Sequence, residues 1–323
     1  MSANTDADSE LWRQFYNLET QLNEKLRNFT THPEISYIYN PVEYAADLHQ
    51  AYLKKYLKGG KKVLFIGLNP GANGMGQTGI PFGNITTVKD IMGLNGTVNQ
   101  PPNVHPKRPV KGLAATIEEP SGKRLWTKFQ ELSDGSLDIF FEQCFVYNFC
   151  PLLFYNSKGD YISPQNLKAP YKRQIGNACL HTIEQILELI QPEVIVAIGR
   201  YAYDNLKAVK YCIEKRLLYL RHPSPRALFQ KNQQNKHKLM KSATIEYIEG
   251  KLCCQAPKSV VKSLSRLNLV IGSISVFPIV GITQQTQNLM FEKVIRSYLI
   301  LNIYGSLKGE MDVMFALDFQ FKN

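Results

Sequence analysis

The chain has 323 residues, a formal net charge of +11 and a hydrophobic share of 44%, which predict one large α/β domain, with or without an appendage, and favour an anionic partner. None of the six cysteines forms a C-x-x-C pair or joins histidines at zinc spacing, so the composition excludes a zinc-finger protein. The start, MSANTDADSELW, is polar and acidic, which excludes a secretory signal there.

The first part of the chain predicts two helices followed by a buried strand. Apolar residues recur at helical spacing over residues 9–29, and a second helix is expected at 45–57, ended by the glycine pair at 59–60. Residues 63–68 form a short apolar run that opens into a loop rich in Gly, Pro and Asn. Such a run is typical of a strand that is buried on both faces.

Three further strands are expected at 144–148, 194–199 and 217–220, with a helix at about 175–190 between the first two of them. Strands that alternate with helices predict a parallel sheet covered on both faces. Ligands of such sheets bind beyond the carboxyl ends of the strands, and the distinctive loops all follow strands. We therefore expect the functional residues in the loops at 69–83, 148–154 and 222–226.

The chain changes character after about residue 255. Residues 267–282 are apolar, but the stretch is short for a membrane span, contains Ser and Gly throughout, and is broken by Pro278. We expect no membrane insertion. The expected organisation is one domain at 1–255 and a C-terminal extension of unknown structure at 256–323.

The loop after the first strand, G67-L-N-P-G-A-N-G-M75, brings the backbone close to a small ligand or makes a tight turn. It has neither the GK[ST] ending of a Walker loop nor the G-x-G-x-x-G spacing, so neither nucleotide-binding motif is met. Its composition alone leaves both the tight turn and the ligand loop open.

Two further residues are candidates for chemistry. His222 heads the segment HPSPR and is held between a strand end and two prolines, although a lone histidine of this kind is usually incidental to a surface turn. Asn148 ends an otherwise apolar strand, and its amide offers two donors and an acceptor to a ligand or to the loop backbone.

Taken together, the loops resemble the single-strand-selective monofunctional uracil-DNA glycosylases of the uracil-DNA glycosylase superfamily. The resemblance covers about residues 11–251 and implies a three-layer α/β/α fold with a central four-stranded parallel sheet. The matching stretches are YNPVEYA (39–45), VLFIGLNPGANGMGQTGIPFGNITTVKD (63–90), HPKRPVKGL (105–113), CFVYNFCPLLF (144–154), VAIGR (196–200) and HPSPR (222–226).

The resemblance also implies roles for four residues of the base pocket. Asn69, in the GLNPG motif, takes the place of the asparagine that positions the attacking water. His222 takes that of the histidine that hydrogen-bonds uracil O2. Asn148 matches the asparagine that reads the uracil edge, and Phe82 matches the aromatic residue that stacks on the flipped base.

Four more positions follow from the same resemblance. Gly71 and Met75 are expected to line the pocket near C5 of the base. Pro225 and Arg226 belong to the loop that wedges into the DNA stack. The family usually continues HPSPR with Asn-Pro, whereas this chain continues with residues 227–229, Ala-Leu-Phe, which puts the shape of the wedge loop in question.

The expected function is a monofunctional DNA glycosylase that excises uracil and 5-hydroxymethyluracil from single- and double-stranded DNA in base-excision repair. We expect a nuclear monomer that needs neither a cofactor nor a metal. One alternative is a catalytically weak DNA-binding protein on the same fold, but binding alone does not need Asn69, His222 and Asn148 together. A second alternative, a nucleotide or sugar-phosphate hydrolase, lacks paired metal-binding carboxylates in these loops.

Overall fold

A computed structural model describes residues 3–29 and 32–224 of the chain. The expected domain end near residue 255, the extension at 256–323 and the wedge residues Pro225 and Arg226, with the Ala-Leu-Phe stretch after them, lie outside the described residues. The domain boundary and the wedge loop therefore stay predictions.

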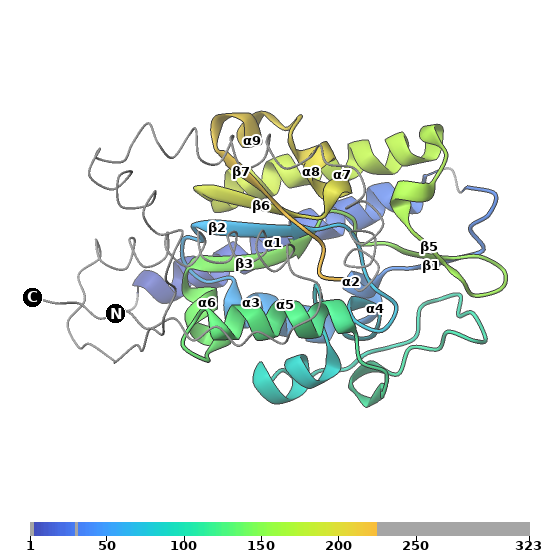
Figure 1. Ribbon diagram of the computed structural model, residues 1–323, viewed down its shortest axis with the longest axis horizontal. Helices are drawn as coiled ribbons and strands as arrows, with labels where there is room; N and C mark the ends of the chain where they lie inside the picture. Colours follow the sequence, from blue (N-terminus) through green and yellow to red (C-terminus); the bar gives the residue numbers. More distant parts are fainter. Residues whose placement is uncertain (1–2, 30–31, 225–323) are drawn as a thin grey trace, which may run out of the picture. The chain divides into compact units, whose positions relative to one another are not determined.

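The centre of the fold is a sheet of four parallel strands in the order β3-β2-β6-β7 (Figure 1). The strands are β2 (Val63–Gly67), β3 (Cys144–Asn148), β6 (Val194–Ile198) and β7 (Arg216–Leu220). Both β2 and β3 are buried along their whole length, which explains why their sequences are continuously apolar rather than alternating. The expected four-stranded parallel sheet is confirmed.

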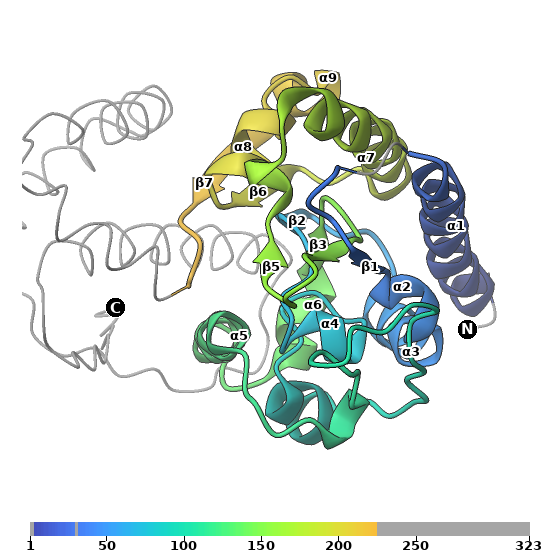
Figure 2. The same cartoon turned by 90° about the vertical axis from the view of Figure 1, so that its right-hand side faces the viewer.

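Helices cover both faces of this sheet, as expected for a three-layer fold. One face carries α5 (Pro120–Glu131) and α6 (Leu137–Gln143), and the other carries α7 (Ala169–Ile190), α8 (Arg200–Leu206) and α9 (Lys210–Glu214) (Figure 2). Right-handed crossovers explain this division. Across the sheet, the connection from β2 to β3 runs one way, whereas those from β3 to β6 and from β6 to β7 run the other way. Crossovers of the same hand that run in opposite directions place their helices on opposite faces.

The two helices expected at the start of the chain are present with slightly different bounds. They are α1 (Ala3–Arg27) and α3 (Ala46–Tyr56), and α1 packs against both α7 and α3. A short helix, α2 (Pro41–Tyr44), precedes α3 and is capped by the Asn40 side chain. Within the described ranges, no helix is long and apolar enough to cross a membrane.

A second, smaller sheet was not expected from the sequence. It is antiparallel, with the order β1-β4-β5, and consists of β1 (Tyr37–Tyr39), β4 (Leu153–Tyr155) and β5 (Tyr161–Ile162). Strands of two or three residues are too short to show a period of two, so hydrophobic patterning does not reveal them. Because β4 follows β3 closely, this sheet stands beyond the carboxyl ends of the large sheet, on the right in Figure 1.

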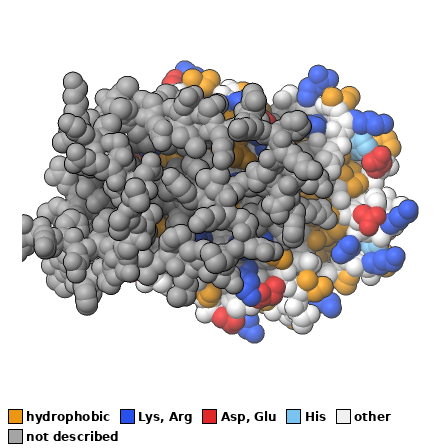
Figure 3. Space-filling view, viewed as in Figure 1, with side chains coloured by type: hydrophobic (Ala, Val, Ile, Leu, Met, Phe, Trp, Pro, Cys, Tyr) orange, Lys and Arg blue, Asp and Glu red, His pale blue; other side chains and the backbone are white. Residues whose placement is uncertain are grey.

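Short helical segments complete the loops around that end. They are α4 (Met75–Thr78), one turn of π-helix at Thr87–Ile91 and two 3-10 turns at Gly112–Ala114 and Pro164–Asn166. On the face seen in Figure 3, Lys and Arg side chains lie among Asp, Glu and hydrophobic ones at the end where β5 lies. This end therefore carries charged groups of both signs.

Candidate active site

Two strand ends meet where the site is expected. Gly67, the last residue of β2, is the register partner of Asn148, the last residue of β3. A Cβ atom on Gly67 would overlap the Asn148 side-chain oxygen and would lie 2.7 Å from Cε2 of Phe82. Only glycine leaves space for both side chains, so β2 ends in a residue that packs Asn148 and Phe82 directly over its backbone.

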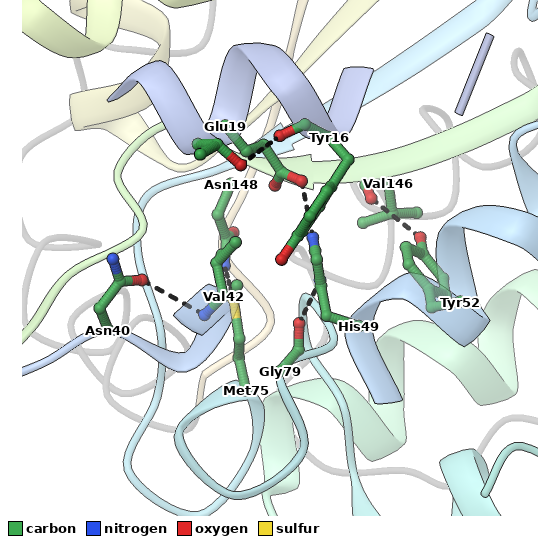
Figure 4. Close-up of polar contacts among 11 residues, drawn as sticks. Tyr16, Glu19, Asn40, Val42, His49, Tyr52, Met75, Gly79, Val146 and Asn148 are labelled. Carbon is green, nitrogen blue, oxygen red and sulfur yellow. Dashed lines mark hydrogen bonds and ion pairs between the residues drawn. The ribbon is translucent and has the colours of Figure 1, made fainter. Parts of the chain in front are cut away.

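The amide of Asn148 is buried and only partly satisfied. The residue is 3% exposed, and its Nδ2 donates to the sulfur of Met75 at 3.2 Å (Figure 4). Its Oδ1 is buried and accepts no hydrogen bond within the described part of the chain. Leaving a buried acceptor unpaired costs about 1–3 kcal/mol. A ligand that brings an N–H group to this oxygen would remove that cost.

Phe82 is held in an unusual backbone conformation. Its φ of +54° lies in the left-handed region, which is rare for an aromatic residue and costs about 1–3 kcal/mol. Its carbonyl accepts hydrogen bonds from the indole of Trp126 at 2.9 Å and from the backbone N–H of Asn84 at 2.7 Å. Gly122 packs so closely that a Cβ there would overlap this carbonyl. These contacts fix the ring against Gly67.

His222 lies near the Phe82 ring, with ring centroids 5.7 Å apart. Its Nδ1 accepts a hydrogen bond from the backbone N–H of Ser224 at 3.2 Å. An accepting ring nitrogen carries no proton, so the proton of the neutral imidazole is on Nε2. Burial lowers the pKa of His222 to about 4. At neutral pH the ring is therefore an uncharged donor through Nε2.

The backbone around His222 is fixed from two sides. Gly199 has a φ of +94° and donates its N–H to the carbonyl of Leu220 at 2.7 Å. The same glycine packs against the His222 side chain, since its Cβ would lie 3.5 Å from that of the histidine. On the other side, Arg124 of α5 donates to the carbonyl of Pro223 at 3.1 Å. The loop at residues 222–224 therefore contacts α5 on one face of the sheet and the residue before α8 on the other.

Asn69 is two residues beyond Gly67, and both ends of its amide are engaged. Its Nδ2 donates to the carbonyl of Leu152 at 3.1 Å, and its Oδ1 accepts from the hydroxyl of Tyr161 at 2.8 Å. Tyr161 was missed by the sequence analysis, because it is far from Asn69 in the chain and its strand β5 is too short to recognise.

The glycine loop after Asn69 has different requirements at different positions. Gly74 and Gly76 are crowded, since a Cβ on either would lie 2.9 Å from a neighbouring side chain. A Cβ on Gly71 would meet only Cγ of Glu119, at 3.8 Å, and the φ of Gly71 is not in the left-handed region. The turn therefore needs glycine at 74 and 76, while Gly71 is exposed and has space beside it.

A buried pair of His49 and Glu19 braces α4, the helix that begins at Met75. Nδ1 of His49 donates to the carbonyl of Gly79, which caps α4, at 2.7 Å, and its Nε2 lies 2.8 Å from a carboxylate oxygen of Glu19 (Figure 4). Both side chains are almost completely buried. Burial acts to lower the pKa of His49, but the charge and hydrogen bond of Glu19 raise it above its ordinary value.

The expected site residues therefore separate into groups. Contacts join Asn148 to Met75 and Phe82 to His222, and Gly67 touches both Asn148 and Phe82. Asn69 and Gly71 lie on the loop that leaves Gly67, and Pro225 and Arg226 lie outside the described residues. In residues 3–29 and 32–224 there is no group of three or more His, Cys, Asp or Glu that could hold a metal ion.

Comparison with known proteins gives a consistent result. The family model described as the uracil DNA glycosylase superfamily matches residues 54–246. The single-strand selective monofunctional uracil DNA glycosylase of Bos taurus is 40% identical over 215 residues, which are 66% of this chain and 79% of the bovine protein. Its Rattus norvegicus counterpart is 39% identical over 215 residues, covering 66% and 77% of the two chains.

A solved structure, that of wild-type SMUG2 from Pedobacter heparinus, aligns with 78% of this chain and 98% of its own, at 21% sequence identity and a TM-score of 0.48.

Proposed function

The chain belongs to the uracil DNA glycosylase superfamily, and from this premise we propose that it is a monofunctional glycosylase that flips uracil out of DNA and hydrolyses its N-glycosidic bond. One observation carries the proposal. The buried Oδ1 of Asn148, which accepts no hydrogen bond within the described chain, lies beside an aromatic ring that itself faces a neutral histidine donor. The three groups together would complement the edge and face of uracil.

Recognition of the base would use both ends of the Asn148 amide. Uracil presents a donor at N3–H and an acceptor at O4, so Oδ1 would accept from N3–H while Nδ2 would donate to O4. Cytosine presents an acceptor at N3 and a donor at its amino group, the reverse pattern. It would leave the buried oxygen unpaired, and this supports selectivity for uracil.

Binding requires the nucleotide to leave the base stack. Flipping costs a few kcal/mol from a duplex and less from a single strand or a mismatch. Stacking on an aromatic ring returns about 1–3 kcal/mol per base, and Phe82, whose ring lies 5.7 Å from that of His222, would supply it. The strained backbone of Phe82 supports this role, because it holds the ring in place before the base arrives.

Bond cleavage would leave an oxocarbenium-like sugar and a uracil anion. The Nε2–H of His222 would donate to uracil O2, where negative charge develops, so it would act mainly in the transition state. Asn69 would orient the water that adds to C1′, and the proton of that water would pass to solvent. An amide is a poor base, so leaving-group stabilisation would supply most of the rate.

Gly71 and Met75 would set tolerance at C5 of the base. The space beside Gly71 supports acceptance of 5-hydroxymethyluracil, because no Cβ occupies it. Thymine would be rejected, since its methyl group offers nothing to the water or donors that a hydroxymethyl group would satisfy. None of Asn69, Gly71, Met75, Phe82, Asn148 and His222 is a lysine that could form a Schiff base, so the proposed product is a simple abasic site.

The proposed substrate is uracil-containing DNA, both single- and double-stranded, with Pro225 and Arg226 in the wedge. The net charge of +11 supports binding to the phosphate backbone. We propose that the protein acts as a monomer in base-excision repair. Because its substrate is DNA, it would act in the nucleus.

The test is a gel assay with a 5′-labelled oligonucleotide that contains one uracil. The purified protein should produce a strand break at the uracil only after alkali treatment, and the matched thymine oligonucleotide should stay intact. Binding without any alkali-labile site would indicate a DNA-binding protein instead. A break without alkali would indicate a lyase or nuclease.

A further inference from the structure

Tyr161 stands at the edge of the site on a rigid hairpin. Its strand β5 pairs with β4, and Tyr161 is the register partner of Tyr155. The turn between the two strands is closed by Asn156, whose side-chain oxygen accepts the backbone N–H groups of Lys158 and Asp160, each at 2.9 Å. The hairpin therefore holds the backbone of Tyr161 in place. The residue is 41% exposed, so it is not part of the core.

The same hairpin fixes both ends of the Asn69 amide. The Leu152 carbonyl, just before β4, can only accept, so the group of Asn69 that faces it is the NH₂ group. The oxygen must then face β5, where the Tyr161 hydroxyl donates to it. Burial raises the pKa of Tyr161 above its ordinary value, although hydrogen bonds with the side chains of Ser163 and Asn69 act to lower it. Together, the hydrogen bonds to Leu152 and Tyr161 prevent the Asn69 amide from exchanging its oxygen and nitrogen.

We propose that Tyr161 is a positioning residue for the glycosylase reaction, which acts by holding the Asn69 oxygen toward the attacking water. This inference rests on the proposed role of Asn69. A carbonyl oxygen has two lone pairs, and the Tyr161 hydroxyl occupies one of them. The other is then presented in a fixed direction, so the water is aligned before the bond breaks. Without the hydroxyl, only the hydrogen bond from Nδ2 to the Leu152 carbonyl restrains rotation of the amide group.

The experiment compares Tyr161→Phe with wild type in single-turnover excision from uracil-containing DNA, together with affinity for DNA that carries uncleavable 2′-fluoro-2′-deoxyuridine. The excision rate should fall about 3–10-fold, the scale of one neutral hydrogen bond. Affinity should stay unchanged, because the phenylalanine ring keeps the packing, and the thermal midpoint should fall by no more than the roughly 2–4 °C expected for one lost hydrogen bond. Tyr203→Phe is the matched control, since the Tyr203 side chain packs on Tyr219 and its hydroxyl makes no hydrogen bond among the described residues.

A double variant separates positioning from a structural role. Asn69→Ala alone should lower the rate by about 100-fold or more, the scale of losing alignment of a reactant. Adding Tyr161→Phe to Asn69→Ala should then cost nothing further, because coupled residues are not additive. Additive losses, weaker DNA binding or a normal rate in Tyr161→Phe would overturn the inference. A normal rate in Asn69→Ala would instead overturn the proposed role of Asn69.

Discussion

Gly67 and Asn148 are register partners at the ends of adjacent parallel strands, and the missing side chain of the first makes space for the amide of the second. The candidate site is therefore built on a pair of strand ends rather than on loops alone. Rigid strands hold polar groups in place more firmly than loops do, which is what recognition of a base edge requires.

Gly67→Ala should abolish uracil excision while the protein still folds. The added methyl group would displace the Asn148 oxygen and the Phe82 ring, so we expect a loss of about 100-fold or more in the single-turnover rate. Gly60→Ala is the matched control, because its Cβ would meet no atom within 4 Å and its φ is not in the left-handed region, so its rate should stay that of wild type. Equal losses in the two variants would contradict this account.

His222→Leu should lower the single-turnover rate by about 10²–10³-fold, the scale of losing one preorganised donor to a developing anion. Affinity for DNA with uncleavable 2′-fluoro-2′-deoxyuridine should change little, since the donor acts mainly in the transition state. A variant with near-normal turnover would remove His222 from the mechanism.

The pH dependence should reflect the low pKa of His222. Because the folded pKa is about 4, the ring should stay neutral down to about pH 5 and its titration should leave no step in the excision rate near 6.5, the ordinary value. Acidification should lower the free energy of unfolding, because the unfolded chain binds this proton near pH 6.5 and the folded chain does not. In denaturant titrations, wild type should therefore lose stability relative to His222→Leu as pH falls from about 6.5 to 4. A rate step near 6.5 that disappears in His222→Leu would contradict the neutral-donor assignment.

His49→Leu should destabilise the fold by about 3–5 kcal/mol, because it leaves the Glu19 carboxylate buried without its partner. The double variant Glu19→Leu, His49→Leu should recover part of that loss, since no charge stays buried. The raised pKa of His49 means that the pair contributes fully below the unfolded pKa and is lost as pH rises through the folded value. Urea titrations measure both effects, and a double variant less stable than His49→Leu would show that the pair is not an ion pair.

Gly71→Tyr tests the pocket at C5. The aromatic ring should fill the space beside the loop, so excision of 5-hydroxymethyluracil should be lost while some action on uracil is kept. The measurement is the ratio of kcat/KM for the two bases, because damage to folding lowers both together. An unchanged ratio would show that Gly71 does not face C5.

The sequence was sufficient to predict the large sheet and three of the helices, α1, α3 and α7, but not α5, α6, α8 or α9. The strands at 63–68, 144–148 and 194–199 are continuous apolar runs, and burial on both faces explains this pattern. The helix α7 shows its periodicity over 22 residues. The sheet β1-β4-β5 could not be predicted, because its strands of two or three residues carry no readable period.

The candidate site was predicted less completely. Asn148 and His222 stood out in the sequence as candidates, and the family resemblance implied roles for them and for Asn69 and Phe82, but it did not reveal their partners. The Tyr161 hydroxyl reaches Asn69 from 92 positions away, and such a contact depends on how the hairpin packs. The tautomer and low pKa of His222 likewise depend on the turn to Ser224 and on burial, which no local pattern encodes.

The central claim is that the buried oxygen of Asn148 receives the N3–H of uracil, and one comparison tests it most directly. Single-turnover excision is measured for uracil and for N3-methyluracil at the same position of the same single-stranded oligonucleotide. The account predicts that the methylated base is excised at least about 100-fold more slowly, because it lacks the donor and leaves the buried oxygen unpaired. Equal rates for the two bases would contradict it.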